Sequence, residues 1–190
     1  MSAQPHLGPQ EQSALLDMAR SAVTAASRRM PARTVGFPGD CPPALSEKAG
    51  AFVTLEKFGT LRGCIGTLNM DKPLWQAVRD SAWSSAGEDH RFAPVSETEL
   101  DELTIEISIL SPLVEIPSAM EFGPGEHGIV IEKDHRRGVF LPKVAVEMGW
   151  EREETLAALC KKAGLPINAW KLPGMRFWIF TAEVFGEDKK

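Results

Sequence analysis

The sequence predicts an α+β fold with a mostly antiparallel sheet flanked by helices. Some segments repeat apolar residues at helical spacing, and others alternate apolar with polar residues as strands do. The two kinds of segment do not follow one another in the regular strand–helix–strand rhythm of a parallel sheet. A chain of 190 residues, 43% of them hydrophobic and 25% charged, is long enough to form one domain with a proper core.

The first third of the chain contains a helix, a loop and a hairpin. Residues 1–9 are polar and contain proline and glycine, so we expect them to be disordered. Apolar spacing predicts an amphipathic helix over about residues 10–29, and residues 31–48 are expected to form a long surface loop. A β-hairpin is then predicted, with strands at 51–55 and 60–68.

The middle of the chain is expected to hold a helix, a charged loop and a strand. Asp71 is predicted to cap a helix that ends near Ala86. The N-terminus of this helix follows the hairpin, where its dipole would favour an anion. Residues 88–94 form the charged loop, and clean alternation predicts a strand over residues 103–110.

The last third is predicted to contain a second hairpin, two helices and a final strand. The hairpin strands are expected at 129–131 and 139–141, and the helices at 143–148 and 151–163. Residues 177–185 are apolar on both faces, which is typical of a strand in the centre of a sheet.

The segment from Leu61 to Gly66 reads Leu-Arg-Gly-Cys-Ile-Gly and is the strongest candidate site. Side chains alternate along a strand, so Arg62 and Cys64 are expected on one face, where the guanidinium would favour a thiolate nucleophile. Gly66 would leave an open position at which a ligand could approach the sulfur. Alternatively, Cys64 is a small buried hydrophobe, and Gly63 and Gly66 serve helix–strand packing.

Further candidates come from charged and imidazole side chains elsewhere. His127 or His90 could act as the base for a Cys64 nucleophile, although no spacing argument places either beside it. Asp89 and Arg91 are candidate ligand-binding residues, the alternative being a local ion pair in an exposed turn. Glu106 lies on the polar face of its predicted strand, which could line a site or meet water.

Composition and motifs argue against several classes of protein. The formal net charge of −5 is unfavourable for a dedicated nucleic-acid binder. No apolar run is long enough to span a bilayer, and no charged-then-apolar leader opens the chain. Three widely spaced cysteines do not suggest a disulfide framework, so we expect a cytoplasmic protein.

No cofactor or metal is predicted. The chain has no C-x-x-C pair and no H-E-x-x-H motif. Residues 123–128 spell the dinucleotide-binding pattern of glycines, but they lead into a predicted strand, whereas that motif must open a helix. Cys160 is expected to pack in the core, and Cys41 to be incidental.

The Leu61–Gly66 segment resembles the signature of the AMMECR family (AMMECR-one-like proteins, also called AmmeMemoRadiSam system protein A). Two positions depart from the family pattern, His90 and Ala93, where proline is expected. The likeness covers roughly residues 10–186 and continues in six further segments, at residues 51–55, 88–94, 105–112, 127–129, 137–142 and 159–166.

The resemblance carries its own expectations. It implies one AMMECR-type domain over residues 10–186, two-lobed, with a smaller lobe over about residues 112–170 and the Cys64 strand facing a cleft between the lobes. Relatives in bacteria and archaea commonly occur alongside a Memo-like protein and a radical SAM protein, which implies an accessory role with these partners. No settled biochemical activity comes with the family.

Three functions are therefore open. We rank first an accessory or binding protein that holds a small anionic ligand or a segment of a partner around residues 62–66. The second is an enzyme that uses Cys64 on a small anionic metabolite. The third is a nucleic-acid-associated regulator, suggested by eukaryotic relatives, and the acidic charge of this chain counts against it.

Overall fold

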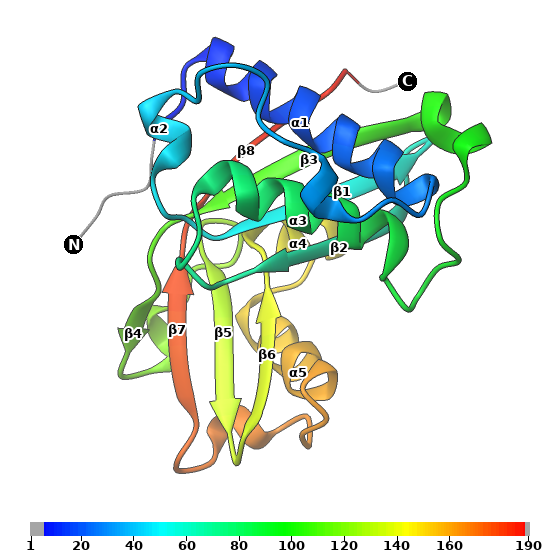
Figure 1. The fold of residues 1–190 in the computed structure, drawn as a ribbon. Coiled ribbons are helices and arrows are strands. Elements are labelled where there is room, and N and C mark those ends of the chain that lie inside the picture. The colour runs from blue at the N-terminus through cyan, green and yellow to red at the C-terminus, as the bar shows by residue number, and fades with distance from the viewer. Residues whose placement is uncertain (1–5, 189–190) are drawn as a thin grey trace. The chain divides into compact units, whose positions relative to one another are not determined.

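A computed structural model describes residues 6–188 of the chain. These residues form two compact units (Figure 1), one up to Leu110 together with the residues from Glu183, the other from Ser111 to Ala182. We call them unit 1 and unit 2. Each contains helices and a four-stranded sheet, which confirms the α+β prediction. The cleft implied by the family resemblance stays a prediction.

Unit 1 is built on a sheet with the strand order β2-β1-β3-β8. Both predicted strands of the first hairpin and the strand at 103–110 are confirmed. β1 pairs antiparallel with β2 on one side and with β3 on the other, which makes β2 an edge strand. The strands are β1 (Ala51–Lys57), β2 (Thr60–Thr67), β3 (Leu103–Leu110) and β8 (Ala182–Gly186).

Two helices, α1 (Pro9–Ser27) and α3 (Leu74–Gly87), cover one face of this sheet, as Figure 1 shows. Their apolar side chains and those of alternate strand residues form a single buried core. The predicted cap of α3 is wrong: Pro73 is the N-cap residue, and the N–H of Leu74 donates to the carbonyl oxygen of Glu47 at 2.8 Å. The core of unit 1 includes Leu15, Ala22, Val23, Val53, Leu55, Val78, Ala82, Ile105 and Ile107.

The ends and loops of unit 1 are more ordered than the sequence suggests. Residues 1–5 of the predicted disordered segment lie outside the described residues, whereas Leu7 is only 2% exposed and packs in the core. The predicted loop at 31–48 contains two short helices, η1 (Ala32–Thr34) and α2 (Pro43–Ser46). A short 3-10 helix, η2 (Glu97–Glu102), precedes β3 and begins with a capping box formed by Ser96 and Glu99.

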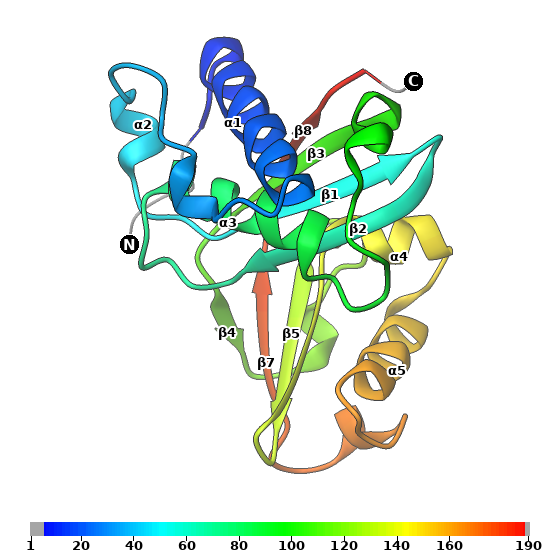
Figure 2. The ribbon, with the colours of Figure 1, turned by 45° about the vertical axis from the view of Figure 1, so that its right-hand side comes forward.

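Unit 2 is built on a sheet with the strand order β4-β7-β5-β6. Helix α5 lies beside β6 in Figure 1 and to one side of β5 in Figure 2, and it buries Leu156, Leu159 and Cys160 against the sheet, as predicted for Cys160. The strands are β4 (Val114–Ile116), β5 (Gly128–Lys133), β6 (Arg136–Phe140) and β7 (Arg176–Phe180), and the helices are α4 (Pro142–Met148), α5 (Arg152–Lys162), η3 (Ala119–Glu121) and η4 (Ala169–Lys171).

The final strand is not continuous, and that prediction is wrong. β7 lies inside the sheet of unit 2, and β8 forms an edge of the sheet of unit 1. The chain leaves one sheet at Thr181, whose backbone N–H donates to the Ser111 hydroxyl and whose carbonyl accepts from the Ser111 N–H, both at 2.9 Å. The apolar pattern continues through this point because both strands are partly buried.

No helix within residues 6–188 combines the length and the apolar character that crossing a membrane requires.

Candidate functional site

The signature strand begins with a β-bulge at Arg62. Leu55 pairs with Gly63 and Glu56 pairs with Leu61, so Arg62 has no partner residue on β1. A bulge bends the strand and redirects the side chain that it inserts. The simple alternation used to place Arg62 beside Cys64 therefore does not hold at this position.

Arg62 forms an ion pair with Glu99 of η2. Its guanidinium donates through Nε at 3.0 Å and through Nη2 at 3.2 Å to the two carboxylate oxygens, and both side chains are less than one-fifth exposed. The hydrogen bond from Arg62 lowers the pKa of Glu99 to about 2, while burial acts in the opposite direction. The cation expected to activate Cys64 is thus engaged by a carboxylate.

Asp89 and Arg91 hold the backbone of Cys64 at the free edge of β2, and we call this pair the Cys64 clamp. The Asp89 carboxylate accepts the N–H of Cys64 at 2.8 Å, and Arg91 Nη2 donates to the carbonyl oxygen of Cys64 at 3.2 Å. The two side chains also pair directly, through Arg91 Nε at 2.9 Å and Nη2 at 2.6 Å. The clamp therefore satisfies both outward-facing backbone groups of Cys64.

Burial and hydrogen bonding fix the charge of the clamp. The Asp89 side chain is 4% exposed, and hydrogen bonds, first from Arg91 and then from the N–H of Cys64, lower its pKa to about 2 against the effect of burial. Hydrogen bonding to Asp89 raises the pKa of Arg91, against the opposing effect of burial. The predicted ligand-binding roles of Asp89 and Arg91 stay predictions.

The thiol of Cys64 lies on the sheet face opposite α1 and α3. It is half-buried, and its Sγ lies 3.5 Å from the hydroxyl of Thr54 on β1. Thr54 is in turn the pairing partner of Glu106 on β3. The three side chains form a row across three strands, which sequence spacing alone could not reveal because strand pairing creates it.

The two glycines of the signature are packing residues. A Cβ on Gly63 would lie 2.2 Å from the carbonyl oxygen of Ser85 on α3, so helix and strand meet backbone to backbone. A Cβ on Gly66 would lie 2.2 Å from Cγ of Phe52. The open position expected at Gly66 is therefore wrong, because the ring of Phe52 fills it.

Ser85 is a residue of the site that sequence reasoning missed. Its Oγ accepts the N–H of Ile65 and donates to the carbonyl oxygen of Val53, each at 2.8 Å, so the hydroxyl bridges β2 and β1. One turn earlier, the hydroxyl of Ser81 donates to the carbonyl oxygen of Ala51 at 3.2 Å. Small residues at i and i+4 of a helix are the sequence signal that indicates such a close approach.

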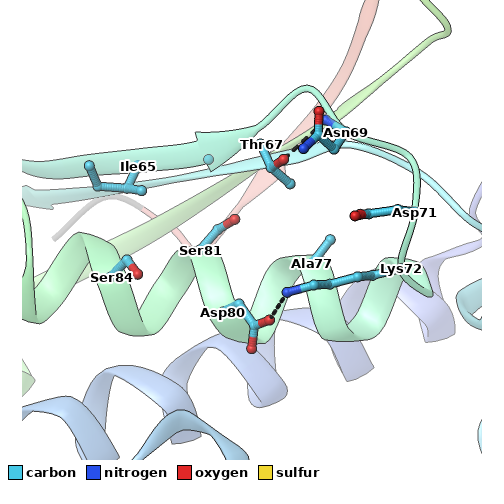
Figure 3. A pocket seen from close by; sticks show the side chains of 10 residues that line it. Ile65, Thr67, Asn69, Asp71, Lys72, Ala77, Asp80, Ser81 and Ser84 are labelled. Atoms are coloured by element: carbon cyan, nitrogen blue, oxygen red, sulfur yellow. Dashed lines mark hydrogen bonds and ion pairs between the residues drawn. The ribbon is translucent and has the colours of Figure 1, made fainter.

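Two hollows lie along the junction of β2 and α3, and Ile65 and Ser84 line both. The first (Figure 3) has a volume of about 290 Å3 and extends past the end of β2 to Lys72, which pairs with Asp80 at 2.7 Å. The second has a volume of about 680 Å3 and lies beside the Cys64 clamp; its remaining lining residues are Gly87, Glu88, Asp89, His90, Phe92 and Pro94.

The two candidate bases lie in different units. His90 is exposed in unit 1. His127 belongs to unit 2, where its Nδ1 accepts the N–H of Gly123 at 3.1 Å. The role of either as a base for Cys64 stays a prediction. Within residues 6–188 no group of three or more His, Cys, Asp or Glu side chains is placed to hold a metal ion.

Comparison with known proteins identifies the family. The AMMECR1 family model matches residues 16–185. The chain belongs to the AMMECR1 family. Relatives include proteins of Thermococcus gammatolerans, 42% identical over 92% of this chain and 89% of the relative, and of Methanothermobacter thermautotrophicus, 39% identical over 96% and 97%.

A solved AMMECR1-family structure supports the fold. The crystal structure of an uncharacterised protein from Pyrococcus horikoshii matches with a TM-score of 0.89 at 36% identity, covering 96% of this chain and 94% of that one. The names of these relatives state no activity. Membership of the AMMECR1 family thus supports the architecture and assigns no activity.

Proposed function

We propose that this AMMECR1-family protein is an accessory binding protein that holds a segment of a partner protein beside residues 62–66. This proposal is based on the observation that the signature residues serve the packing and hydrogen bonding of the fold. Gly63 and Gly66 provide close packing, the Cys64 backbone is held by the clamp, and Arg62 is paired with Glu99. A catalytic signature would instead direct its charged groups at the reacting atom.

The charge pairing favours a partner segment over a small anionic ligand. Both cations of the predicted site are neutralised, Arg62 by Glu99 and Arg91 by Asp89. A site for a small anion needs cations or N–H groups that are not already satisfied. The hollows beside β2 contribute extended, partly apolar surface, which suits a polypeptide.

The choice of partners rests on the family. Because related proteins commonly occur alongside a Memo-like protein and a radical SAM protein, we propose these two as the binding partners. Titration calorimetry of the purified full chain against each of them tests the proposal. Binding at tens of micromolar or tighter, with no turnover by the chain alone, is the expected result. Two folded partners that both fail to bind at roughly that concentration would refute it.

An enzyme that depends on Cys64 is the second candidate, favoured by one observation. The Sγ of Cys64 is half-buried beside the Thr54 hydroxyl and is not sealed in the core, unlike the fully buried Cys160. The alkylation rates of Cys64 and Cys160 can be measured separately by mass spectrometry after a pulse of iodoacetamide. If Cys64 acts as a nucleophile, it should react much faster than the exposed model thiol glutathione; a rate at or below that of glutathione argues for the binding protein.

A further inference from the structure

The clamp does not cover the free edge of β2 at Gly66. Edge strands present unpaired backbone groups and are normally covered or blocked. The clamp covers this edge at Cys64 through Asp89 and Arg91. In an antiparallel pair the backbone groups of a strand alternate between its two sides, so the N–H and C=O of Gly66, two residues on, point to the same edge.

These Gly66 groups adjoin the first hollow. Within the described residues no side chain bonds to them, and Gly66 itself lines the hollow. Figure 3 shows Ile65 and Thr67 of β2 facing Ala77, Ser81 and Ser84 of α3 across it. An edge strand with open backbone groups beside a helix is the arrangement by which sheets accept an extended peptide as an additional strand.

The unpaired charged side chains along this groove indicate which charge a bound segment would carry. Lys72 and Arg79 share the carboxylate of Asp80, and Arg91 pairs with Asp89. Asp71 is exposed and, within residues 6–188, has no cation paired with it; Glu88, in the second hollow, accepts only from the Ser84 hydroxyl at 2.8 Å. Among the described residues, Asp71 and Glu88 are thus carboxylates of the groove that no cation pairs with, one in each hollow.

We propose that the groove between the β2 edge and α3 binds an extended, basic segment of a partner protein by strand addition at Gly66. This inference rests on the proposed binding role and specifies how the partner is held. The backbone groups of Gly66 would pair with the segment, Asp71 and Glu88 would attract its cationic side chains, and its apolar side chains would contact Ile65 and Ala77.

The test uses the full chain and a fluorescein-labelled peptide of alternating lysine and valine as the probe. Fluorescence anisotropy should show saturable binding. Two comparison peptides separate the contributions: alternating glutamate and valine, and the lysine peptide with alternate backbone nitrogens methylated, which keeps its charge but loses its ladder donors. Both should bind at least about ten-fold more weakly. Equal binding of the methylated peptide would overturn strand addition.

Variants of the groove provide a second arm. Ser84→Arg fills the position shared by both hollows and adds a cation, so it should weaken probe binding by about ten-fold or more. Asp71→Lys combined with Glu88→Lys should do the same without filling the groove. Glu121→Lys, an exposed change in unit 2, is the matched control. Folded variants, as judged by thermal melting, that bind the probe like the wild type would overturn the proposal.

Amide hydrogen exchange locates the contact. The exchange of the Gly66 N–H should slow when the probe binds, because a ladder bond then protects it. Unchanged exchange at saturation, or slowing caused by raising the concentration of the protein alone, would contradict the inference; the latter would indicate pairing with a second copy. If the Memo-like and radical SAM proteins bind but are insensitive to Ser84→Arg, this inference fails while the proposed function stands.

Discussion

At the scale of single residues, two carboxylates outside the signature hold its backbone and its arginine in place. The Asp89 carboxylate accepts a hydrogen bond from the N–H of Cys64, and the Glu99 carboxylate accepts one from the guanidinium of Arg62. The sequence indicated the local partners of both, since Asp89 and Arg91 are close in sequence and Glu99 completes a capping box. Their contacts with β2 could not be predicted, because they depend on where the loop after α3 lies.

Asp89→Asn tests the clamp. In the folded protein the pKa of Asp89 is lowered from 3.8 to about 2. A lowered pKa means that the carboxylate stabilises the fold above pH 3.8 and that this contribution is lost as the pH falls through about 2. The variant should lose about 2 kcal/mol of unfolding free energy at neutral pH. Urea denaturation measures the loss, with the exposed Asp40→Asn as control.

The protonation of Asp89 should also be visible in how the stability of the protein depends on pH. Wild-type stability should fall between about pH 4 and pH 2, where Asp89 and Glu99 both take up protons, and Asp89→Asn should show a shallower fall. Identical pH profiles for the wild type and the variant would contradict the account of the clamp.

Arg62→Leu separates a structural role of this cation from a catalytic one. Because Arg62 is paired with Glu99, its removal should leave this partly buried carboxylate with only Ser96 and Lys57 as partners and cost about 1 to 3 kcal/mol in urea denaturation. The alkylation rate of Cys64, followed by mass spectrometry, should change little. A large drop in that rate in a stable variant would instead show that the guanidinium acts on the thiol.

At the scale of elements, the contact between β2 and α3 organises unit 1. The hydroxyl of Ser85 bridges the two strands, and Gly63 lies against the backbone of the helix. The individual elements could be predicted from their periodicity, because each has a buried face. The close approach of β2 and α3 needs both Ser85 and Gly63. These residues are distant in the sequence, so only their small size indicated the contact.

Gly63→Ala tests this contact. The new methyl group would be 2.2 Å from the Ser85 carbonyl oxygen, so the helix or the strand must shift, and we expect a loss of about 1 to 3 kcal/mol or more. Gly36→Ala is the matched control, since nothing lies within 4 Å of the position of its Cβ. Comparable stability of the two variants in urea would show that β2 and α3 do not pack this tightly in solution.

At the scale of the whole molecule, the chain folds as two units, one of them discontinuous. β8 returns the C-terminal segment to the sheet of unit 1, where the Glu187 carboxylate binds Arg20 and accepts the N–H of Ile105. Sequence periodicity predicted the two strands at the C-terminus as one, because Thr181 and Glu183 are the only polar residues between Phe177 and Phe185. Unit 2 is continuous in sequence and has its own core.

This division predicts the behaviour of fragments. Residues 111–182 expressed alone should unfold cooperatively, since their core lies within the segment. A chain that ends at Ala182 should be destabilised in unit 1, which loses the contacts of Glu187 with Arg20 and Ile105. Circular dichroism during thermal melting checks both. A fragment that shows no cooperative transition would mean that unit 2 needs unit 1 to fold.

We propose that the signature strand supports binding and that Cys64 does not act as a nucleophile. Calorimetry with the Memo-like protein tests it most directly, comparing the wild type, Cys64→Ser and Ser84→Arg after thermal melting has shown that all three are folded. We expect Cys64→Ser to bind within about two-fold of the wild type and Ser84→Arg to bind about ten-fold more weakly or worse. Loss of binding in Cys64→Ser, with Ser84→Arg unaffected, would contradict the proposal.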